Sequence, residues 1–215
     1  MSTRAEPSSA LEKDWWLRAV AVLQSPRAVF AALRDDSEEA ASARQEPLLA
    51  IVWLAGIAAI LSTTAAARIL DDYQIDDLVL AIWAFLAGGI YGIGGYWLGG
   101  GAVYLGARGA GSEGSYRQAR HLLGLAAAPL ALSLLAVWPV RLAIYGADLF
   151  RTGGGDHGLG DDVFRGLVAA FGAWAVVLLL LGVRTVHGWS WGRSLAAVSL
   201  AAVVLVLFGL VPIVL

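Results

Sequence analysis

The chain has 215 residues, of which 59% are hydrophobic and only 15% are charged, and its mean hydropathy is +0.70. An ordinary soluble domain carries about 25% charged residues, so the composition excludes a soluble globular protein. Cysteine is absent, which excludes disulfide bonds and thiolate metal sites. The net charge is −2 and there is no dense basic patch, so a nucleic-acid partner is not expected.

The first 46 residues are polar and lack the apolar core of a cleavable signal peptide. Ser9 with Glu12 fits a capping box, and Ser25-Pro26 fits a second helix start. We therefore predict two short amphipathic helices, followed by a solvated acidic linker over 35–46. The helices either lie in the membrane interface or pack under the bundle, and the apolar spacing leaves both arrangements open.

Five apolar stretches follow, each reaching or exceeding the roughly 18 residues that a spanning helix needs. A chain in lipid must satisfy its backbone hydrogen bonds internally. The predicted fold is therefore all-α, a bundle of five transmembrane helices forming one membrane domain over 47–215. The predicted spans are 47–67, 78–105, 122–146, 166–183 and 195–215.

The arginines predict the orientation of these spans, because Lys and Arg concentrate in cytoplasmic loops. With the N-terminus inside, eleven Lys and Arg residues lie on the cytoplasmic side and only Arg68, Arg151 and Arg165 lie outside. Arginine outnumbers lysine fourteen to one, and Ala and Gly are abundant, which favours a bacterial source. We expect a multi-pass inner-membrane protein with its N-terminus in the cytoplasm and its C-terminus outside.

The second predicted span is rich in glycine, and Gly88, Gly92, Gly95 and Gly99 recur along one stripe. In lipid such a stripe allows another helix to approach closely. The alternative is an unwound helix that lines a transport path, and close packing is the preferred interpretation. The span has 28 residues, or about 42 Å of helix, against a hydrocarbon core of about 30 Å, so it must tilt, bend or project from the membrane.

Pro129 lies inside the third span, where it removes a backbone donor and predicts a kink near 126–128. Arg141 is the one ionisable residue within any predicted span. A charge inside the bilayer is a functional candidate by default. However, Arg141 lies about 7.5 Å of helix rise from the end of its span, so a structural or interfacial role is preferred.

Catalytic and cofactor sites are not predicted. The segment Gly188-Trp189-Ser190-Trp191-Gly192 matches the G-x-S-x-G pattern of a hydrolase, but it joins two membrane helices instead of a strand and a helix. The outer loops collect eight aspartates and His157, yet their spacing does not match a calcium loop. No acidic residue lies within a span, which disfavours a proton-coupled carrier. We therefore expect no enzyme, no metal and no cofactor.

Several elements resemble one known family. They are Pro26, Phe30 and Leu33 ahead of the first span, the loop Gly114-Ser115-Tyr116-Arg117-Gln118-Ala119-Arg120-His121, the helix with Pro129, and the loop 186–193. Together with the five spans they resemble the bacterial branch of the Yip family, the Ypt-interacting integral membrane proteins. For eukaryotic members the resemblance implies non-enzymatic adaptors that bind prenylated Rab-type GTPases. Their Asp-Leu-Tyr-Gly-Pro element is missing here, so that role is not expected.

The resemblance and the lack of a catalytic set predict a membrane scaffold or interaction protein. Its expected partners are the lipid bilayer and another membrane protein or a second copy of itself. The candidate partner surface lies on the cytoplasmic side and consists of Trp15, Trp16, Phe30, Arg117 and Arg120. The alternative function is a small-molecule or ion channel or transporter lined by the glycine-rich second span.

Overall fold

The computed structural model describes residues 7–62, 77–146 and 158–214, and every regular element in these ranges is a helix. The N-terminal arm holds α1 (Pro7–Ala21), α2 (Pro26–Ala32) and α3 (Glu38–Ala43). The remaining helices are α4 (Gln45–Leu61), α6 (Asp77–Gly109), α7 (Tyr116–Ala126), α8 (Ala128–Ala136), α9 (Trp138–Tyr145), α10 (Leu159–His187) and α11 (Trp191–Val214).

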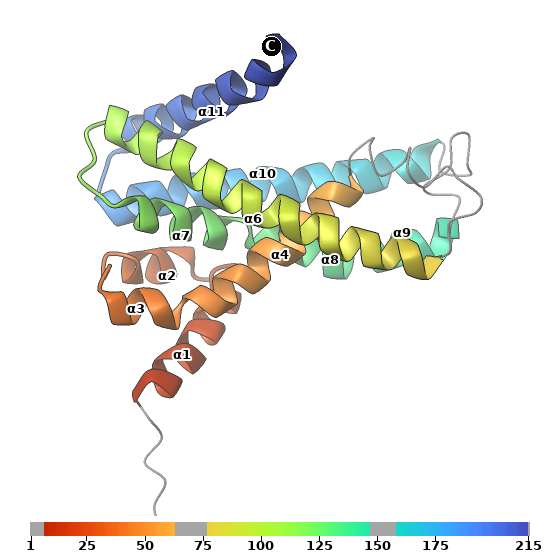
Figure 1. The fold of residues 1–215 in the computed structure, drawn as a ribbon, viewed down its shortest axis with the longest axis horizontal. Helices are drawn as coiled ribbons and strands as arrows, with labels where there is room; N and C mark the ends of the chain where they lie inside the picture. Colours follow the sequence, from red (N-terminus) through yellow and green to blue (C-terminus); the bar gives the residue numbers. More distant parts are fainter. Residues whose placement is uncertain (1–6, 63–76, 147–157, 215) are drawn as a thin grey trace, which may run out of the picture.

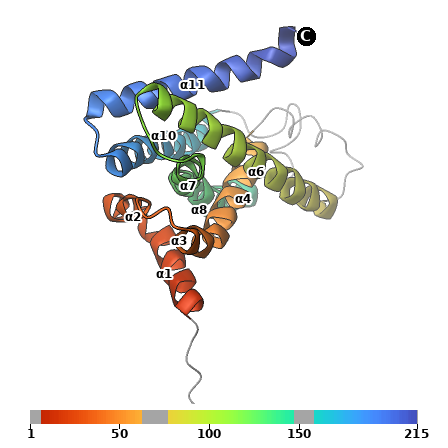
Figure 2. The same cartoon turned by 60° about the vertical axis from the view of Figure 1, so that its left-hand side comes forward.

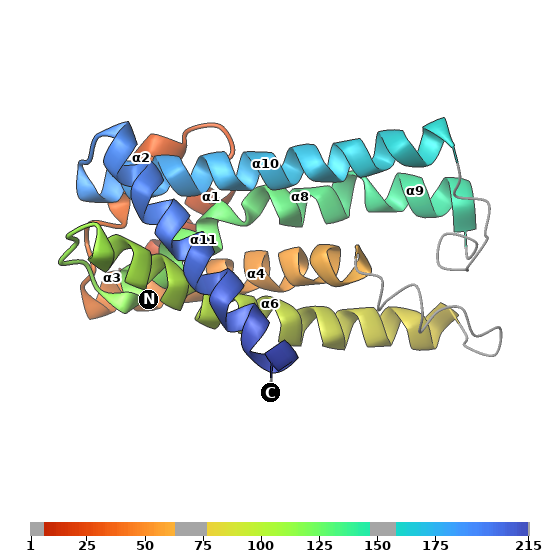
Figure 3. The same ribbon diagram turned by 90° about the horizontal axis from the view of Figure 1, so that it is seen from above.

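The bundle consists of four roughly parallel rods, namely α4, α6, the series α7–α8–α9, and α10 (Figures 1 and 3). Four segments are long and apolar enough to cross a membrane: Glu38–Leu61, Ala81–Gly109, Tyr116–Tyr145 and Leu159–His187. Large apolar side chains on the outer surface are exposed, as a lipid-facing surface requires, and Ile90 and Leu98 are 75% and 73% exposed. The prediction of an all-α, multi-pass membrane protein is therefore confirmed.

The fifth predicted span differs from the other four. The helix α11 has 24 residues, Trp191–Val214, and its segment Trp191–Leu207 is apolar. Figure 3 shows α11 crossing α6 obliquely instead of running beside the rods. Its first half packs at Gly106, where an added Cβ would lie 2.7 Å from the backbone nitrogen of Ala201. A fifth spanning helix therefore stays a prediction.

The glycines of α6 meet α4 at a backbone-to-backbone crossing. A Cβ added at Gly56 of α4 would lie 2.6 Å from Cα of Gly92 and closer still to the carbonyl oxygen of Gly88. A Cβ at Gly88 would lie 2.6 Å from Cα of Ile57. Two members of the predicted stripe thus pack on α4, and the other two do not. Gly99 faces the side chain of Leu123 on α7, and Gly95 has nothing within 4 Å of its Cβ position.

The third rod is interrupted twice. One interruption falls at Ala127, inside the segment 126–128 predicted for the kink, and Pro129 lies in the first turn of α8. The other falls at Val137, with Pro139 in the first turn of α9. Proline lacks a backbone donor and clashes with the preceding turn, so each helix restarts where proline is tolerated.

We call the end of the bundle that carries α1–α3 the arm end, and the opposite end the far end. At the far end, Nη2 of Arg141 lies 2.6 Å from Oδ1 of Asp161. Nε of Arg165 lies 2.6 Å from the other carboxylate oxygen. Asp161 is buried in the first turn of α10. Arg141 therefore belongs to an ion-pair group that joins α9 to α10, which supports the structural role preferred for it.

The acidic segment 35–46 is not a solvated linker, and that part of the prediction is wrong. Ser37 caps α3 by accepting a hydrogen bond from the backbone of Ala40 at 3.3 Å. Ala41 and Ala43 are buried, and Arg44 is fully buried. The sequence did not predict this packed face, because its buried residues are alanines, which are only slightly more hydrophobic than their neighbours.

Most of the outer-loop acids, and also His157, lie outside the described residues. These acids are Asp71, Asp72, Asp76, Asp148 and Asp156.

Candidate functional site

The helices α1–α3 of the arm pack against one end of the bundle, as Figures 1 and 2 show. Phe30 of α2 is fully buried, and its ring fills the notch at Gly182 of α10 beside Leu122 of α7. Trp15 of α1 is 3% exposed and belongs to the same hydrophobic core. The arm and the bundle therefore share one core. Trp15 and Phe30 were predicted to form a partner surface, but the structure places both inside this core.

The turn between α2 and α3 directs Asp36 toward the bundle. The backbone N–H of Ser37 donates to Oδ1 of Asp35 at 3.1 Å, a local hydrogen bond typical of Asp in turns. This bond is the main cause of the lowered pKa of Asp35. Asp35 is thereby occupied by its own turn, and Asp36 is left to reach across to α7.

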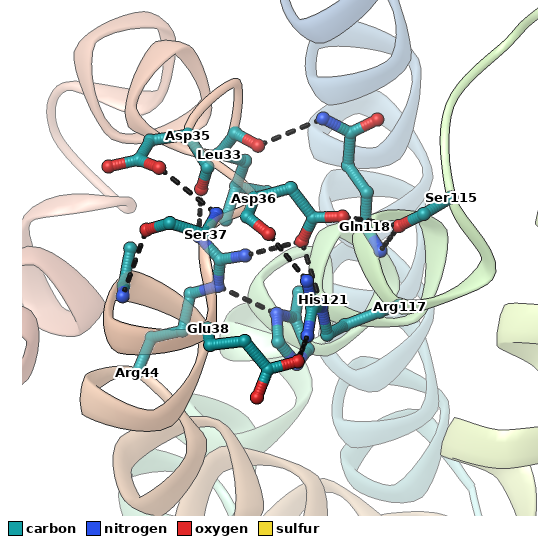
Figure 4. A network of polar contacts seen from close by, with 11 residues as sticks. Leu33, Asp35, Asp36, Ser37, Glu38, Arg44, Ser115, Arg117, Gln118 and His121 are labelled. Carbon is teal, nitrogen blue, oxygen red and sulfur yellow. Dashed lines mark hydrogen bonds and ion pairs between the residues drawn. The ribbon is translucent and has the colours of Figure 1, made fainter.

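Asp36 is the centre of a polar network that joins the arm to α7 (Figure 4). Its Oδ1 accepts from Nη2 of Arg44 and from Nε of Arg117, both at 3.0 Å. Its Oδ2 accepts from the hydroxyl of Ser115 at 2.5 Å. Arg117 also donates to the backbone oxygen of Asp36 at 2.5 Å and to Glu38 at 3.2 Å. We call Asp36, Arg44, Ser115, Arg117 and His121 the arm-docking network.

Arg44 is the buried member of this network. Its Nε donates to Nδ1 of His121 at 2.7 Å, and its Nη1 donates to the backbone oxygen of Asp35 at 2.8 Å. Because Nδ1 of His121 accepts a hydrogen bond from the N–H of Arg44, this nitrogen carries no hydrogen. The imidazole is therefore neutral and carries its hydrogen on Nε2. The guanidinium also lies 5.6 Å from the ring centre of Trp15. The three nitrogens of the buried guanidinium thus each donate to an acceptor, and the group also lies near the aromatic ring of Trp15. A buried cation needs such partners to offset the loss of water.

Arg120 lies one helical turn after Arg117 but faces α6. Its guanidinium carbon lies 3.7 Å from the ring centre of Trp97, 5.1 Å from that of Tyr96 and 5.5 Å from that of Tyr116. The hydroxyl of Tyr116 donates to the backbone oxygen of Trp97 at 2.8 Å and fixes two of these rings together. We call Arg120 with these three residues the aromatic cage.

The loop with the G-x-S-x-G pattern performs a structural task. Gly188 ends α10 in the left-handed conformation, with φ of 67°. The hydroxyl of Ser190 accepts from the backbone N–H of Arg193 at 3.4 Å, at the start of α11. His187 stacks on Trp189 with ring centres 4.5 Å apart. The pattern therefore marks a helix–helix turn, and Ser190 serves as a cap.

The polar groups at the arm end do not form a recognisable catalytic set. Oγ of Ser112 lies 3.4 Å from Nδ1 of His187, but it also accepts the backbone N–H of Gly114 at 2.9 Å. In the part of the chain that the structure describes, no carboxylate is hydrogen-bonded to His187 and no three His, Asp or Glu residues group as a metal site. The arrangement is suited to holding helices together and to presenting surfaces.

Among the described side chains of the arm, the large apolar ones that are exposed lie on α1. Trp16, Leu17 and Val20 are 44%, 65% and 66% exposed, whereas Trp15 and Ala19 on the opposite face are buried. These three side chains form one face of the helix, which we call the α1 patch. Figure 1 shows α1 projecting from the bundle, so the patch is displayed beside the membrane domain.

Three other residues were predicted for the partner surface. The structure places Arg117 and Arg120 on α7, and it leaves Trp16 exposed on α1. The sequence-based prediction missed Asp36, Arg44 and His121, the partners that hold the arm. Two local signals were available. Ser37 followed by Glu38 and Glu39 is a helix start, and Arg44 is a single basic residue immediately before a membrane helix.

A comparison with family models identifies one match, the Yip1 domain, over residues 20–213. No curated protein and no solved structure matches the chain. The matched range starts inside α1 and includes the arm-docking network, the aromatic cage and all rods of the bundle. Because this range covers nearly the whole chain, the protein belongs to the Yip1 domain family.

Proposed function

We propose that the protein is a non-enzymatic scaffold of a bacterial inner membrane, with its arm end in the cytoplasm and α11 as a fifth span that ends outside. The α1 patch is the surface that binds another membrane protein or a second copy of the chain. The observation that supports this is the unequal burial of α1. One face is anchored through Trp15, while Trp16, Leu17 and Val20 stay exposed.

The patch has the composition of a binding surface. Exposed apolar patches bordered by polar residues mark interaction sites, and tryptophan is enriched at the centre of such sites. Lys13 is exposed and Arg18 partly so, and they lie beside the patch, with Arg18 paired to Asp14 at 2.7 Å. Because the arm-docking network fixes the arm, the patch is held in place before a partner arrives, which lowers the entropy cost of binding.

A transport path along α6 lacks comparable support. The hollow beside α6 is lined by apolar residues and two tyrosines, and no ionisable Asp, Glu, Lys or Arg lines it. Ser133 is buried and donates its hydroxyl to the backbone oxygen of Leu130 at 2.7 Å. A conducting path needs a polar lining across the bilayer.

Site-specific photocrosslinking in cells tests the α1 patch. A photoreactive amino acid at Leu17 is expected to crosslink the chain to a defined protein band, and the same residue at Leu98 on the lipid-facing side of α6 is not. The triple substitution of Trp16, Leu17 and Val20 by serine should prevent capture of that protein by a crosslinker placed at Lys13. Crosslinking to lipid alone at Leu17 would show that α1 is a membrane anchor instead of a partner surface.

Cysteine labelling tests the orientation. The chain contains no cysteine, so a single cysteine can be introduced without background. Glu113→Cys, in the exposed loop at the arm end, is expected to react with a membrane-impermeant maleimide only after the inner membrane is opened. Leu159→Cys, 86% exposed at the far end, should react in intact spheroplasts. The opposite pattern would invert the proposed topology.

A further inference from the structure

A groove of about 170 Å³ opens on the side of the bundle between α4, α6 and the α7–α8 junction. Its walls are almost entirely apolar, and Gly56, Gly92 and Gly95 contribute bare backbone to them. The groove lies within segments that are long and apolar enough to span a membrane. It is lined by Val52, Ala55, Gly56, Ala59, Tyr91, Gly92, Gly95, Tyr96, Leu123, Gly124, Ala127 and Leu130.

The lining of the groove covers about one to two helical turns on each of its walls. Its lining on α6 extends from Tyr96 to Tyr91, and its lining on α7 and α8 extends from Leu123 to Leu130. At 1.5 Å of rise per residue these segments are about 7.5 Å and 10 Å long. One end lies beside Tyr96, near the arm end, and the other lies deeper in the bundle. An acyl chain that enters at the end beside Tyr96 would lie against both walls as it passes deeper into the bilayer.

A cationic group lies at the arm-end mouth of the groove. Tyr96 lines the groove and also forms one wall of the aromatic cage around Arg120. Leu123 and Gly124, at the same mouth, are one turn of α7 beyond Arg120. The groove and the Arg120 guanidinium therefore share a wall and follow one another along the bundle.

Arg120 differs from its neighbours in how its charge is balanced. Arg44 and Arg117 both pair with Asp36, whereas no carboxylate pairs with Arg120 within residues 7–62, 77–146 and 158–214. Its Nε is buried and has no hydrogen-bond partner, and the side chain as a whole is partly exposed. The cage orients the guanidinium without neutralising it, since aromatic rings supply no formal charge.

We infer that this groove binds one acyl chain of an anionic phospholipid from the arm-end leaflet, with the lipid phosphate at Arg120. Arginine matches phosphate through paired N–H donors. Trp97, half-exposed beside Arg120, lies where tryptophan is enriched at a membrane interface. The inference does not depend on the α1 patch, which lies on a different element and recognises protein.

Native mass spectrometry of the full chain in mild detergent tests the lipid site. The probe is an equal mixture of phosphatidylglycerol and phosphatidylcholine with identical acyl chains. We expect phosphatidylglycerol to be retained about tenfold better, because both lipids carry the same phosphate but the choline cation of phosphatidylcholine is repelled by Arg120, whereas the glycerol headgroup is neutral. Equal retention of the two lipids would overturn the inference. Displacement by glycerophosphoglycerol, which has no acyl chains, would also overturn it by showing a headgroup site only.

Substitutions separate the two halves of the site. Arg120→Gln should abolish the preference between headgroups, whereas Arg108→Gln, an exposed arginine at the same end of the bundle, should leave it unchanged. Gly95→Leu fills open space in the groove and should prevent retention of both lipids. Gly94→Leu is the matched control, because Gly94 also has nothing within 4 Å of its Cβ position but does not line the groove.

The fold of each variant is checked by thermal unfolding before its lipid binding is compared. If Gly95→Leu does not fold, Gly95→Val serves in its place, because the Cβ position is open. A folded Gly95 variant that retains phosphatidylglycerol as the parent does would overturn the groove assignment. A structural role of Arg120 alone would change stability and leave the ratio of the two lipids at its original value.

Discussion

Gly56→Ala is expected to destabilise the bundle more than any other single methyl group added to the described glycines. The new Cβ would overlap the backbone of α6 at Gly88 and Gly92. No side-chain rotation relieves a clash between two backbones, so α4 and α6 must separate along their shared length. We expect a loss above about 3 kcal/mol, beyond the usual range for overpacked cores.

The thermal unfolding midpoint and the yield of monodisperse protein in detergent measure this effect. Gly94→Ala is the control. It adds the same methyl group to α6, one of the two helices, at a position where nothing lies within 4 Å of the new Cβ. It should be neutral or slightly stabilising, because alanine is the better helix former. Similar midpoints for the two variants would mean that α4 and α6 do not cross as closely as described.

Asp36→Ala is expected to release the arm from the bundle. The substitution removes the only carboxylate paired with Arg44 among the described residues, and that arginine is fully buried. Removing one partner of a buried ion pair costs about 3–5 kcal/mol, because the remaining charge stays without compensation. In the described part of the chain, the polar contacts of Asp36 with the rods are confined to the start of α7, at Ser115 and Arg117, so the loss should fall mainly on the docking of α1–α3.

Hydrogen exchange and limited trypsin cleavage at Arg34 measure docking of the arm. Faster exchange over 26–43 and faster cleavage are expected in the Asp36→Ala variant. Glu39→Ala is the control, because it removes an equal charge from the same arm, three residues further along the chain and at an exposed position. The double variant Asp36→Leu with Arg44→Met should recover protection, since apolar replacement of a buried ion pair is often neutral. Unchanged exchange in Asp36→Ala would contradict the central role of Asp36.

The helical rods could be predicted from the sequence because each depends on local information. The stretch 78–105 predicts α6 from continuous apolarity, and Pro129 predicts the position of a break because proline acts on its own turn. The contact of Gly88 and Gly92 with another helix follows from spacing alone. Which helix they meet does not follow, and Gly95, in the same stripe, meets none.

The candidate site could not be predicted in the same way, because its members are distant in sequence. Arg44 and His121 are separated by 77 residues, and Asp36 and Arg117 by 81. Nothing in the local pattern distinguishes Asp36 from Asp35, yet one joins the arm to α7 and the other completes a turn. Arg141 was located, but its partner Asp161 was counted among the outer-loop acids. Only the fold shows that it begins α10.

The separation between Arg44 and His121 also has a consequence for synthesis of the chain. A ribosome adding about 5–20 residues per second completes Arg44 roughly 4 to 15 seconds before His121, given their separation of 77 residues. During that interval α4 and α6 are synthesised, but His121 and the helix α7, which receive the arm, do not yet exist. The arm can therefore close onto the bundle only after α7 has been made.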